Sequence, residues 1–239
     1  MKIIILAAGR GSRMKNITKD QPKCLVEFQG KPLLEWQLEA IREAGFSEIG
    51  IVTGYKSEML SRYGLFEFHN PRWDNTQMVS SLSYASDWLE KEPCIVSYSD
   101  IFYDAEAIQL LGKSTADIAI TFDPNWQKLW EGRFNNPLID AETFRLNSDG
   151  TLAEIGNQPK TMDEIEGQYM GLLRFTPYGW NELKYLRSEL TTKNQDNMHM
   201  TGSLALILKN GKIPIFALPY DKTWGEVDSI DDLSFYESK

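Results

Sequence analysis

A glycine-containing loop with cations on both sides follows the first predicted strand of the chain. The strand covers residues 2–7, and the loop Ala8-Gly9-Arg10-Gly11-Ser12-Arg13 comes directly after it. Consecutive backbone amides in such a loop can form a nest that binds anions, and open α/β sheets bind ligands beyond the carboxyl ends of their strands. Arg13 and Lys23 bracket the glycines and match the charge of a triphosphate. A plain turn is the alternative for the glycine pattern alone.

The loop differs from two common phosphate-binding patterns. Gly9 and Gly11 fit the start of a dinucleotide fingerprint, but Met14 stands where the third glycine belongs. No acidic residue ends a second strand at the usual spacing, and no Gly-Lys-Ser/Thr follows the loop. The sequence therefore argues against a nicotinamide oxidoreductase and against a P-loop.

The composition is that of an ordinary globular protein with one large domain or two small ones. The chain has 239 residues, of which 42% are hydrophobic, and its two cysteines indicate a reducing compartment rather than a disulfide framework. Its longest apolar run is far shorter than the ~20 residues of a membrane span, and no signal-peptide pattern opens the sequence. We therefore expect a cytoplasmic protein with no membrane partner.

The charge is distributed unevenly along the chain. The formal net charge is −9, which disfavours nonspecific binding to nucleic acid. Residues 1–31 hold seven basic and two acidic side chains, a net of +5, so the remaining residues carry −14. This asymmetry is consistent with a local anion site near the N-terminus, and solvated surface lysines are the alternative.

Strands and helices alternate over the first 115 residues. The pattern predicts strands at 2–7, 24–28, 48–53, 65–69 and 94–98, and helices at 32–44, 57–63 and 78–89. Such alternation is typical of a mostly parallel α/β sheet. After residue 115, strand-like pieces at 117–122, 134–138, 143–146, 152–155, 168–175 and 212–217 accompany helices at 178–190, 199–208 and 229–236. We predict one domain, residues 1–239, in which a nucleotide-binding half (1–115) is completed by a mixed sheet insert.

Several motifs in this order resemble the nucleoside-triphosphate transferase family. They are Leu6-Ala7-Ala8-Gly9-Arg10-Gly11-Ser12-Arg13, Pro22-Lys23, Gly30-Lys31-Pro32-Leu33, Ser99-Asp100 and Gly225-Glu226-Val227-Asp228-Ser229. More narrowly, the chain resembles small cytidylyltransferases that act on phosphocholine and similar phosphorylated or phosphonate compounds. The resemblance implies a Rossmann-like three-layer αβα fold with a mostly parallel mixed central sheet and a small C-terminal sheet insert. It also implies that residues 116–239 form the acceptor-binding half and carry a second metal aspartate.

The resemblance also implies the reaction. A phosphate or phosphonate oxygen of the acceptor attacks the α-phosphorus of CTP, and pyrophosphate leaves. The loop and Arg13 would hold the β- and γ-phosphates, Lys23 would contact the α-phosphate, and Asp100 and Asp228 would coordinate Mg²⁺. The alternatives are a surface lysine at Lys23 and a helix N-cap at Asp228.

A polar segment, residues 75–81, is the candidate for recognition of the base. By resemblance, cytosine is bound by main chain near the loop and by small polar residues at a helix start, although an Asn or Thr N-cap would explain the same residues. Many sugar-nucleotide members of the family have Ala-Gly where this loop has Ala-Ala, so the resemblance favours cytidine over thymidine or guanosine. The implied nucleotide-binding residues are Leu6, Ala8, Gly9, Gly11, Ser12, Arg13, Lys23, Gly54, Asn75, Thr76, Ser80 and Ser99.

The acceptor pocket is expected in the second half of the chain. Its candidate residues are Trp126, Trp130, Arg133, Asp140, Glu142, Glu166, Gln168 and Tyr169. The tryptophans and acids could enclose a choline-type ammonium, or Arg133 and Lys160 could bind the carboxylate of an amino-acid-like acceptor whose amine meets an acid. The stretch resembles a branch associated with amino-acid-derived phosphates, including phosphoglutamine, in bacterial surface polysaccharides. Core packing is the alternative for both tryptophans.

The leading hypothesis is thus a Mg²⁺-dependent cytidylyltransferase. A sugar-1-phosphate nucleotidyltransferase is the alternative within the same chemistry, and a nucleotide-binding domain without turnover is the alternative outside it. The two histidines, His69 and His199, lack metal-site spacing and are expected to be structural. We expect CTP and a small phosphorylated acceptor as partners and no nucleic acid, and a homo-oligomer is a further candidate.

Overall fold

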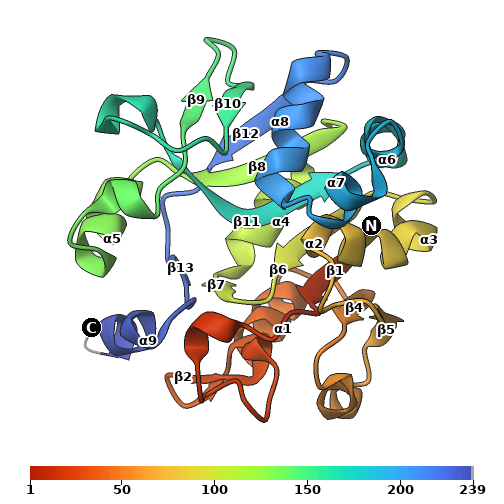
Figure 1. The fold of residues 1–239 in the computed structure, drawn as a ribbon, viewed down its shortest axis with the longest axis vertical. Helices are drawn as coiled ribbons and strands as arrows, with labels where there is room; N and C mark the ends of the chain where they lie inside the picture. Colours follow the sequence, from red (N-terminus) through yellow and green to blue (C-terminus); the bar gives the residue numbers. More distant parts are fainter. Residues whose placement is uncertain (238–239) are drawn as a thin grey trace.

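One mixed sheet organises the computed structural model, which describes residues 1–237 (Figure 1). Within these residues the sheet has seven strands, and it takes strands from both sides of residue 115. In spatial order they are β12 (Ile215–Pro219), β8 (Ile118–Asp123), β11 (Gln168–Phe175), β6 (Cys94–Tyr98), β1 (Lys2–Ala7), β4 (Ile49–Thr53) and β5 (Phe66–His69). Every neighbouring pair is parallel except the two pairs that β11 makes, so the sheet is mostly parallel as predicted.

The alternating side chains of β1 divide the core between two faces of the sheet. Ile3 and Ile5 belong to one buried cluster, whereas Ile4 belongs to the other. The first cluster is covered by α1 (Leu33–Glu43), α4 (Ala105–Lys113) and α5 (Trp126–Arg133). The second is covered by α2 (Met78–Leu82), α3 (Ser86–Leu89), α6 (Pro177–Ser188) and α8 (Met200–Asn210), with α7 (Thr192–Asp196) against α2. Helices on both faces confirm the predicted three-layer α/β class, because a parallel sheet must bury both of its faces.

Three small ribbons flank the main sheet within the described range. They are β2 (Glu27–Phe28) with β3 (Lys31–Pro32), β9 (Phe144–Leu146) with β10 (Leu152–Ile155), and β7 (Ile101–Tyr103) with β13 (Trp224–Glu226). The β7–β13 ribbon is antiparallel, and beyond it the Val227 amide donates to the Asp100 carbonyl at 2.8 Å. This pairing carries the C-terminal segment, which continues into α9 (Ile230–Glu237), across to the end of β6.

Several predicted elements differ from the structure. Residues 24–28 form a 3-10 turn, η2 (Lys23–Leu25), and only two residues of strand, because Pro22 introduces a turn. Residues 134–138 are not a strand: the Asn136 side chain accepts from the Leu138 amide and caps the 3-10 helix η5 (Pro137–Ile139). Helices α4 and α5 were not predicted, and the predicted 78–89 helix is interrupted by the 3-10 turn η4 (Ser83–Ala85).

The other 3-10 helices are η1 (Ser12–Met14), η6 (Met162–Glu164) and the seven-residue η3 (Ser57–Tyr63), which lies at the helix predicted for 57–63. Among the described helices, none combines the length and apolar character that a membrane span requires.

A bulge in β11 brings the sheet close to a tyrosine at the end of β6. Gly171 has a φ of +80°, and a Cβ there would lie 2.7 Å from Cδ2 of Tyr98. The register between β11 and β8 shifts around this point. Gly171 therefore has two reasons to be glycine, which are its left-handed backbone and the space that the Tyr98 ring occupies.

We predict that Gly171→Ala lowers the free energy of unfolding by about 3 kcal/mol, since the strained backbone and the overpacked ring each cost roughly 1–3 kcal/mol. Gly150→Ala is the matched control, because Gly150 also has a φ of +80° but nothing lies within 4 Å of its Cβ position. Urea unfolding of both variants should give the larger loss for Gly171→Ala. Equal losses would show that the Tyr98 contact contributes nothing.

Candidate active site

The glycine loop is shaped around a lysine side chain. Gly11 has a φ of +72°, and a Cβ at this position would lie 2.7 Å from Cβ of Lys23. The Gly11 carbonyl accepts from the Thr18 hydroxyl at 2.9 Å and from the Met14 amide at 3.0 Å. Any larger residue at position 11 would therefore displace the lysine that passes beneath the loop.

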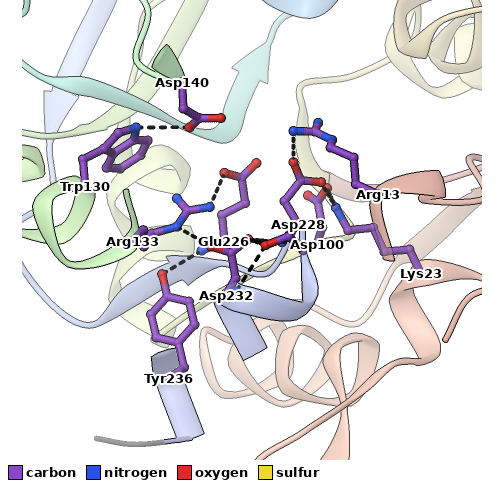
Figure 2. Close-up of polar contacts among 11 residues, drawn as sticks. Arg13, Lys23, Asp100, Trp130, Arg133, Asp140, Glu226, Asp228, Asp232 and Tyr236 are labelled. Atoms are coloured by element: carbon purple, nitrogen blue, oxygen red, sulfur yellow. Dashed lines mark hydrogen bonds and ion pairs between the residues drawn. The ribbon is translucent and has the colours of Figure 1, made fainter. Parts of the chain in front are cut away.

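Lys23 lies between two carboxylates that come from distant parts of the chain (Figure 2). Its Nζ donates to Oδ2 of Asp100 at 2.7 Å and also to Oδ1 of Asp228. The lysine side chain is 8% exposed. Burial by itself lowers the pKa of Lys23, but the charges of Asp100 and Asp228 outweigh burial and raise it. Arg13, whose side chain is largely exposed, pairs with the other oxygen of Asp228.

The two aspartates fit a divalent cation. Oδ1 of Asp100 is buried and has no hydrogen-bond partner among the described residues. Within residues 1–237 no group of three or more His, Cys, Asp or Glu side chains could hold a metal. Mg²⁺ is commonly held by one or two carboxylates together with phosphate oxygens of the substrate. Asp100 and Asp228 would supply the protein part of such a site.

The glycine loop opens into a cavity of about 280 Å³ at the carboxyl ends of β1 and β6. Nine of the predicted nucleotide-binding residues line it: Leu6, Ala8, Gly9, Gly11, Ser12, Arg13, Lys23, Thr76 and Ser99. Asp100 and Asp228, predicted as metal ligands, also line it, as do Gln77, Met78 and Ser81 of the predicted base-recognition segment 75–81. Trp73 and Tyr98 line it without having been predicted. Tyr98 directly precedes the Ser99-Asp100 motif, whereas no sequence signal marks Trp73.

Three predicted nucleotide-binding residues do not line this cavity. Gly54 lies behind the loop, where a Cβ would be 2.4 Å from Cβ of Trp73. The Asn75 side chain donates to the neighbouring Asp74. Ser80 faces α6 and α7 instead, donating to the Gln195 carbonyl at 3.0 Å and accepting from Arg187. The helical turn at the start of α2 directs Ser81, and not Ser80, toward the cavity.

A second cavity of about 210 Å³ adjoins the first, and both are lined by Arg13, Met78, Tyr98 and Asp228. Five predicted acceptor residues line it: Trp130, Asp140, Glu142, Gln168 and Tyr169. Residues of this lining that were not predicted include Glu226, Trp224, His199 and Thr201. Glu226 belongs to the C-terminal motif and Trp224 directly precedes it, so this motif could have identified both residues as candidates.

Carboxylates give the second cavity its electrostatic character. Burial raises the pKa of Asp140 and of Glu142. Burial, together with the negative charge of Asp100, raises the pKa of Glu226 to about 7. Burial disfavours the charged forms of these acids, and a cationic group bound beside them would favour the charged forms.

The remaining predicted acceptor residues lie elsewhere, and this corrects the expectation for them. Trp126 is 4% exposed, and its Nε1 donates to the Ile165 carbonyl in the core. Glu166 accepts from the Leu146 amide at 2.6 Å. Arg133 is buried in ion pairs with Asp232 and Glu226 and is not part of the cavity lining. The side chain of Trp130 is both core and pocket wall, since it is 4% exposed and its Nε1 donates to Asp140.

The fold and this geometry define a nucleotide-binding α/β protein with two adjoining pockets, whose shared wall includes one of the two aspartates that pair with Lys23. A family model described as a MobA-like NTP transferase domain matches residues 3–145. A CTP:phosphoglutamine cytidylyltransferase of Campylobacter jejuni is 39% identical over 250 aligned residues, which cover 98% of each chain. A choline-phosphate cytidylyltransferase of Streptococcus pneumoniae is 37% identical over 102 residues, or 41% of this chain and 42% of the relative.

The inositol-1-phosphate CTP transferase structure of T. maritima shares the fold, with a TM-score of 0.79, 16% identity, and coverage of 99% of this chain and 94% of that one. The chain belongs to the MobA-like NTP transferase family and lies in its cytidylyltransferase branch. It is a nucleotidyltransferase, as its motifs predicted, and enzymes of this kind generally use a divalent metal.

We predict that Lys23→Met lowers turnover about 10²–10³-fold, since loss of one preorganised charge that stabilises a transition state costs this much. Lys184→Met is the matched control, because Lys184 pairs with Glu90 on an exposed surface. Steady-state kinetics and circular dichroism would be measured on both variants. A folded Lys23→Met enzyme with nearly normal turnover would contradict the assignment.

Proposed function

We propose that this enzyme transfers CMP from CTP to a small acceptor that carries both a phosphate-type group and an amine, with release of pyrophosphate and with Mg²⁺ as cofactor. One observation carries the proposal: two pockets of different charge share the walls Arg13, Met78, Tyr98 and Asp228. Asp228 therefore lies at the junction of the pockets, where two bound anions would meet, and its partner Lys23 lines the first pocket beside it.

The loop side of the junction suits a triphosphate. Backbone amides of the loop, Arg13 and the ammonium of Lys23 supply positive charge on one side of the first cavity. Thr76, Gln77 and Ser81 line the same cavity and offer the donors and acceptors that a pyrimidine edge requires. The Campylobacter jejuni relative, similar over 98% of both chains, is named for its use of CTP, and this supports cytosine as the base.

The carboxylate side of the junction suits an ammonium group. Asp140, Glu142 and Glu226 all line the second cavity, and the aromatic rings of Tyr98 and Tyr169 lie beside them, 5.8 Å apart at their centroids. An amino-acid-derived phosphate such as phosphoglutamine, the acceptor in the relative's name, combines such an amine with an anionic end. Phosphocholine has the same two charges, so both belong in the test.

The proposed reaction is a single in-line displacement. An oxygen of the acceptor's phosphate-type group forms a bond to the α-phosphorus, and the bond from that phosphorus to the bridging oxygen of the β-phosphate breaks. Lys23 and Arg13 offset the negative charge of the reacting groups, and the pocket walls hold the two reactants in line. When bound to Asp100 and Asp228, Mg²⁺ would supply further charge neutralisation at the phosphate oxygens. No side chain needs to act as a nucleophile.

The product would be a CMP-linked small molecule, an activated donor for a later transferase. We place the reaction in the cytoplasm, where CTP is available, and propose that it serves the decoration of a bacterial surface polysaccharide. A homo-oligomer is compatible with this proposal but is not needed for it, because both pockets are formed within one chain.

Pyrophosphate release tests the proposal directly. The purified enzyme would be assayed with Mg²⁺ and each of CTP, UTP, GTP, ATP and dTTP, against phosphoglutamine, phosphocholine, 2-aminoethylphosphonate, glycerol phosphate and hexose-1-phosphates. We expect release only with CTP and an acceptor that bears a cationic nitrogen, either an amine or a quaternary ammonium, and loss of release when the metal is chelated. Release only with a hexose-1-phosphate would establish a sugar nucleotidyltransferase instead. CTP binding without release from any pair would favour a domain without turnover.

The carboxylate pocket yields a prediction with a matched control. Glu142→Gln should raise the acceptor KM about tenfold and leave the CTP KM unchanged, since a hydrogen bond to a charged group contributes roughly 1.5–3 kcal/mol. Glu166→Gln removes a nearby carboxylate that bonds the Leu146 amide outside the cavity, so its acceptor KM should stay normal. A change in the CTP KM for Glu142→Gln, or equal effects from both variants, would show that the acceptor does not bind in this pocket.

A further inference from the structure

The segment that carries Asp228 depends on contacts from another part of the chain. Asp228 follows the short strand β13 and precedes α9, both of which lie at the margin of the fold rather than in the main sheet (Figure 1). Helix α5 packs against α9, and the approach is close: a Cβ on Gly132 would lie 2.6 Å from the Phe235 ring. The last residue of α5 is Arg133.

The Arg133 guanidinium is buried between α5 and the C-terminal segment (Figure 2). Its side chain is 1% exposed, and the rings of Trp130 and Phe134 lie 5.1 and 5.0 Å from it. Nε donates to Oδ1 of Asp232 at 2.8 Å, and Nη2 donates to Oε2 of Glu226 at 3.3 Å. The guanidinium thus holds one carboxylate on each side of Asp228 in the sequence.

Asp232 passes this contact on to Asp228. While its Oδ1 accepts from Arg133, its Oδ2 accepts from the Asp228 amide at 3.0 Å, from the Ser229 amide at 2.8 Å and from the Ser229 hydroxyl at 2.9 Å. One carboxylate therefore joins the arginine to the backbone of Asp228. The Asp228 side chain then reaches Lys23 and Arg13 at the junction of the two pockets.

We propose that Arg133 is a positioning residue for Asp228, acting through Asp232, and that it sets the metal and triphosphate side of the site rather than binding the acceptor. The inference rests on the proposed function in that it takes Asp228 as a metal ligand. Groups that orient a metal ligand from behind affect metal affinity strongly, because the ligand's direction is fixed by its own hydrogen bonds. The guanidinium donates along two directions at once, which a lysine cannot reproduce.

The test compares two buried arginines. Arg133→Gln removes the contact to Asp232, whereas Arg174→Gln removes an arginine on β11 that donates to the Ala116 carbonyl and lines neither pocket. Loss of either charge should lower stability. Only Arg133→Gln should weaken divalent-metal binding, by about tenfold, a typical effect of losing a group that supports a metal ligand. Mn²⁺ binding in the presence of CTP, measured by water-proton relaxation, would report this without turnover.

Kinetics distinguish a role of Arg133 in positioning Asp228 from a role in binding the acceptor. We expect Arg133→Gln to raise the Mg²⁺ concentration for half-maximal rate and to lower kcat, with the acceptor KM within twofold of normal. Asp232→Asn should have the same effect, and the double variant should lose no more than either single one, because coupled residues are not additive. Arg133→Lys should retain part of the metal affinity, and it replaces Arg133→Gln in the test if that variant does not fold.

Three results would overturn the proposal. A raised acceptor KM with an unchanged metal titration would make Arg133 an acceptor ligand. Equal metal affinities in Arg133→Gln and Arg174→Gln would make it a structural arginine only. Additive losses in the double variant would separate Arg133 from Asp232. Mn²⁺ and CTP binding are measured without an acceptor. The metal-binding result therefore tests the role of Arg133 even if the proposed acceptor is wrong.

Discussion

The bridge from Lys23 to Asp100 and Asp228 is the interaction on which the rest of the structure depends. It joins residues separated by 77 and 205 positions in sequence, and it places three charges in a largely buried setting. Removing one partner of a buried ion pair is strongly destabilising, since the remaining charge is left unpaired. The segments that carry Lys23, Asp100 and Asp228 must therefore be positioned correctly relative to one another. A bound cation and triphosphate would add charges of both signs to the same point, so the bridge also holds the site ready for them.

Three local features bring the segments together. Gly11 leaves room for Lys23 under the loop, the buried strand β6 ends at Asp100, and the β7–β13 ribbon returns the chain from the far half to the same place. Parallel strands deliver their carboxyl ends to one edge of a sheet, which is why the loop after β1 and the end of β6 lie together. The ribbon is different, because it brings Asp228 to this edge from outside the main sheet, and α5 and α9 must hold it.

The sequence was sufficient for the features that depend on local patterns. The apolar runs of β1, β6 and β11 and the glycine loop are visible without a structure, and motif order indicated the aspartates that Lys23 bridges. Arg133 was placed in the acceptor pocket because its residue type suits an anion, but type does not show that Asp232 and Glu226 already occupy its donors. Trp73 lines the first cavity through tertiary packing alone, which has no signature in composition or spacing, whereas Tyr98 directly precedes the Ser99-Asp100 motif.

The two pockets together explain how one small site can bring anionic reactants into contact. Repulsion between a triphosphate and a phosphate-bearing acceptor must be offset where they meet. Arg13 lines both pockets, and Lys23 lines the first pocket beside it. The carboxylates Asp140, Glu142 and Glu226 line the second cavity, where they would repel a purely anionic ligand and attract an ammonium. An acceptor with a positive end and a negative end would be oriented by these opposite charges, with its phosphate-type group directed toward the α-phosphorus. Charge asymmetry across the junction would then select the acceptor and align it through the same contacts.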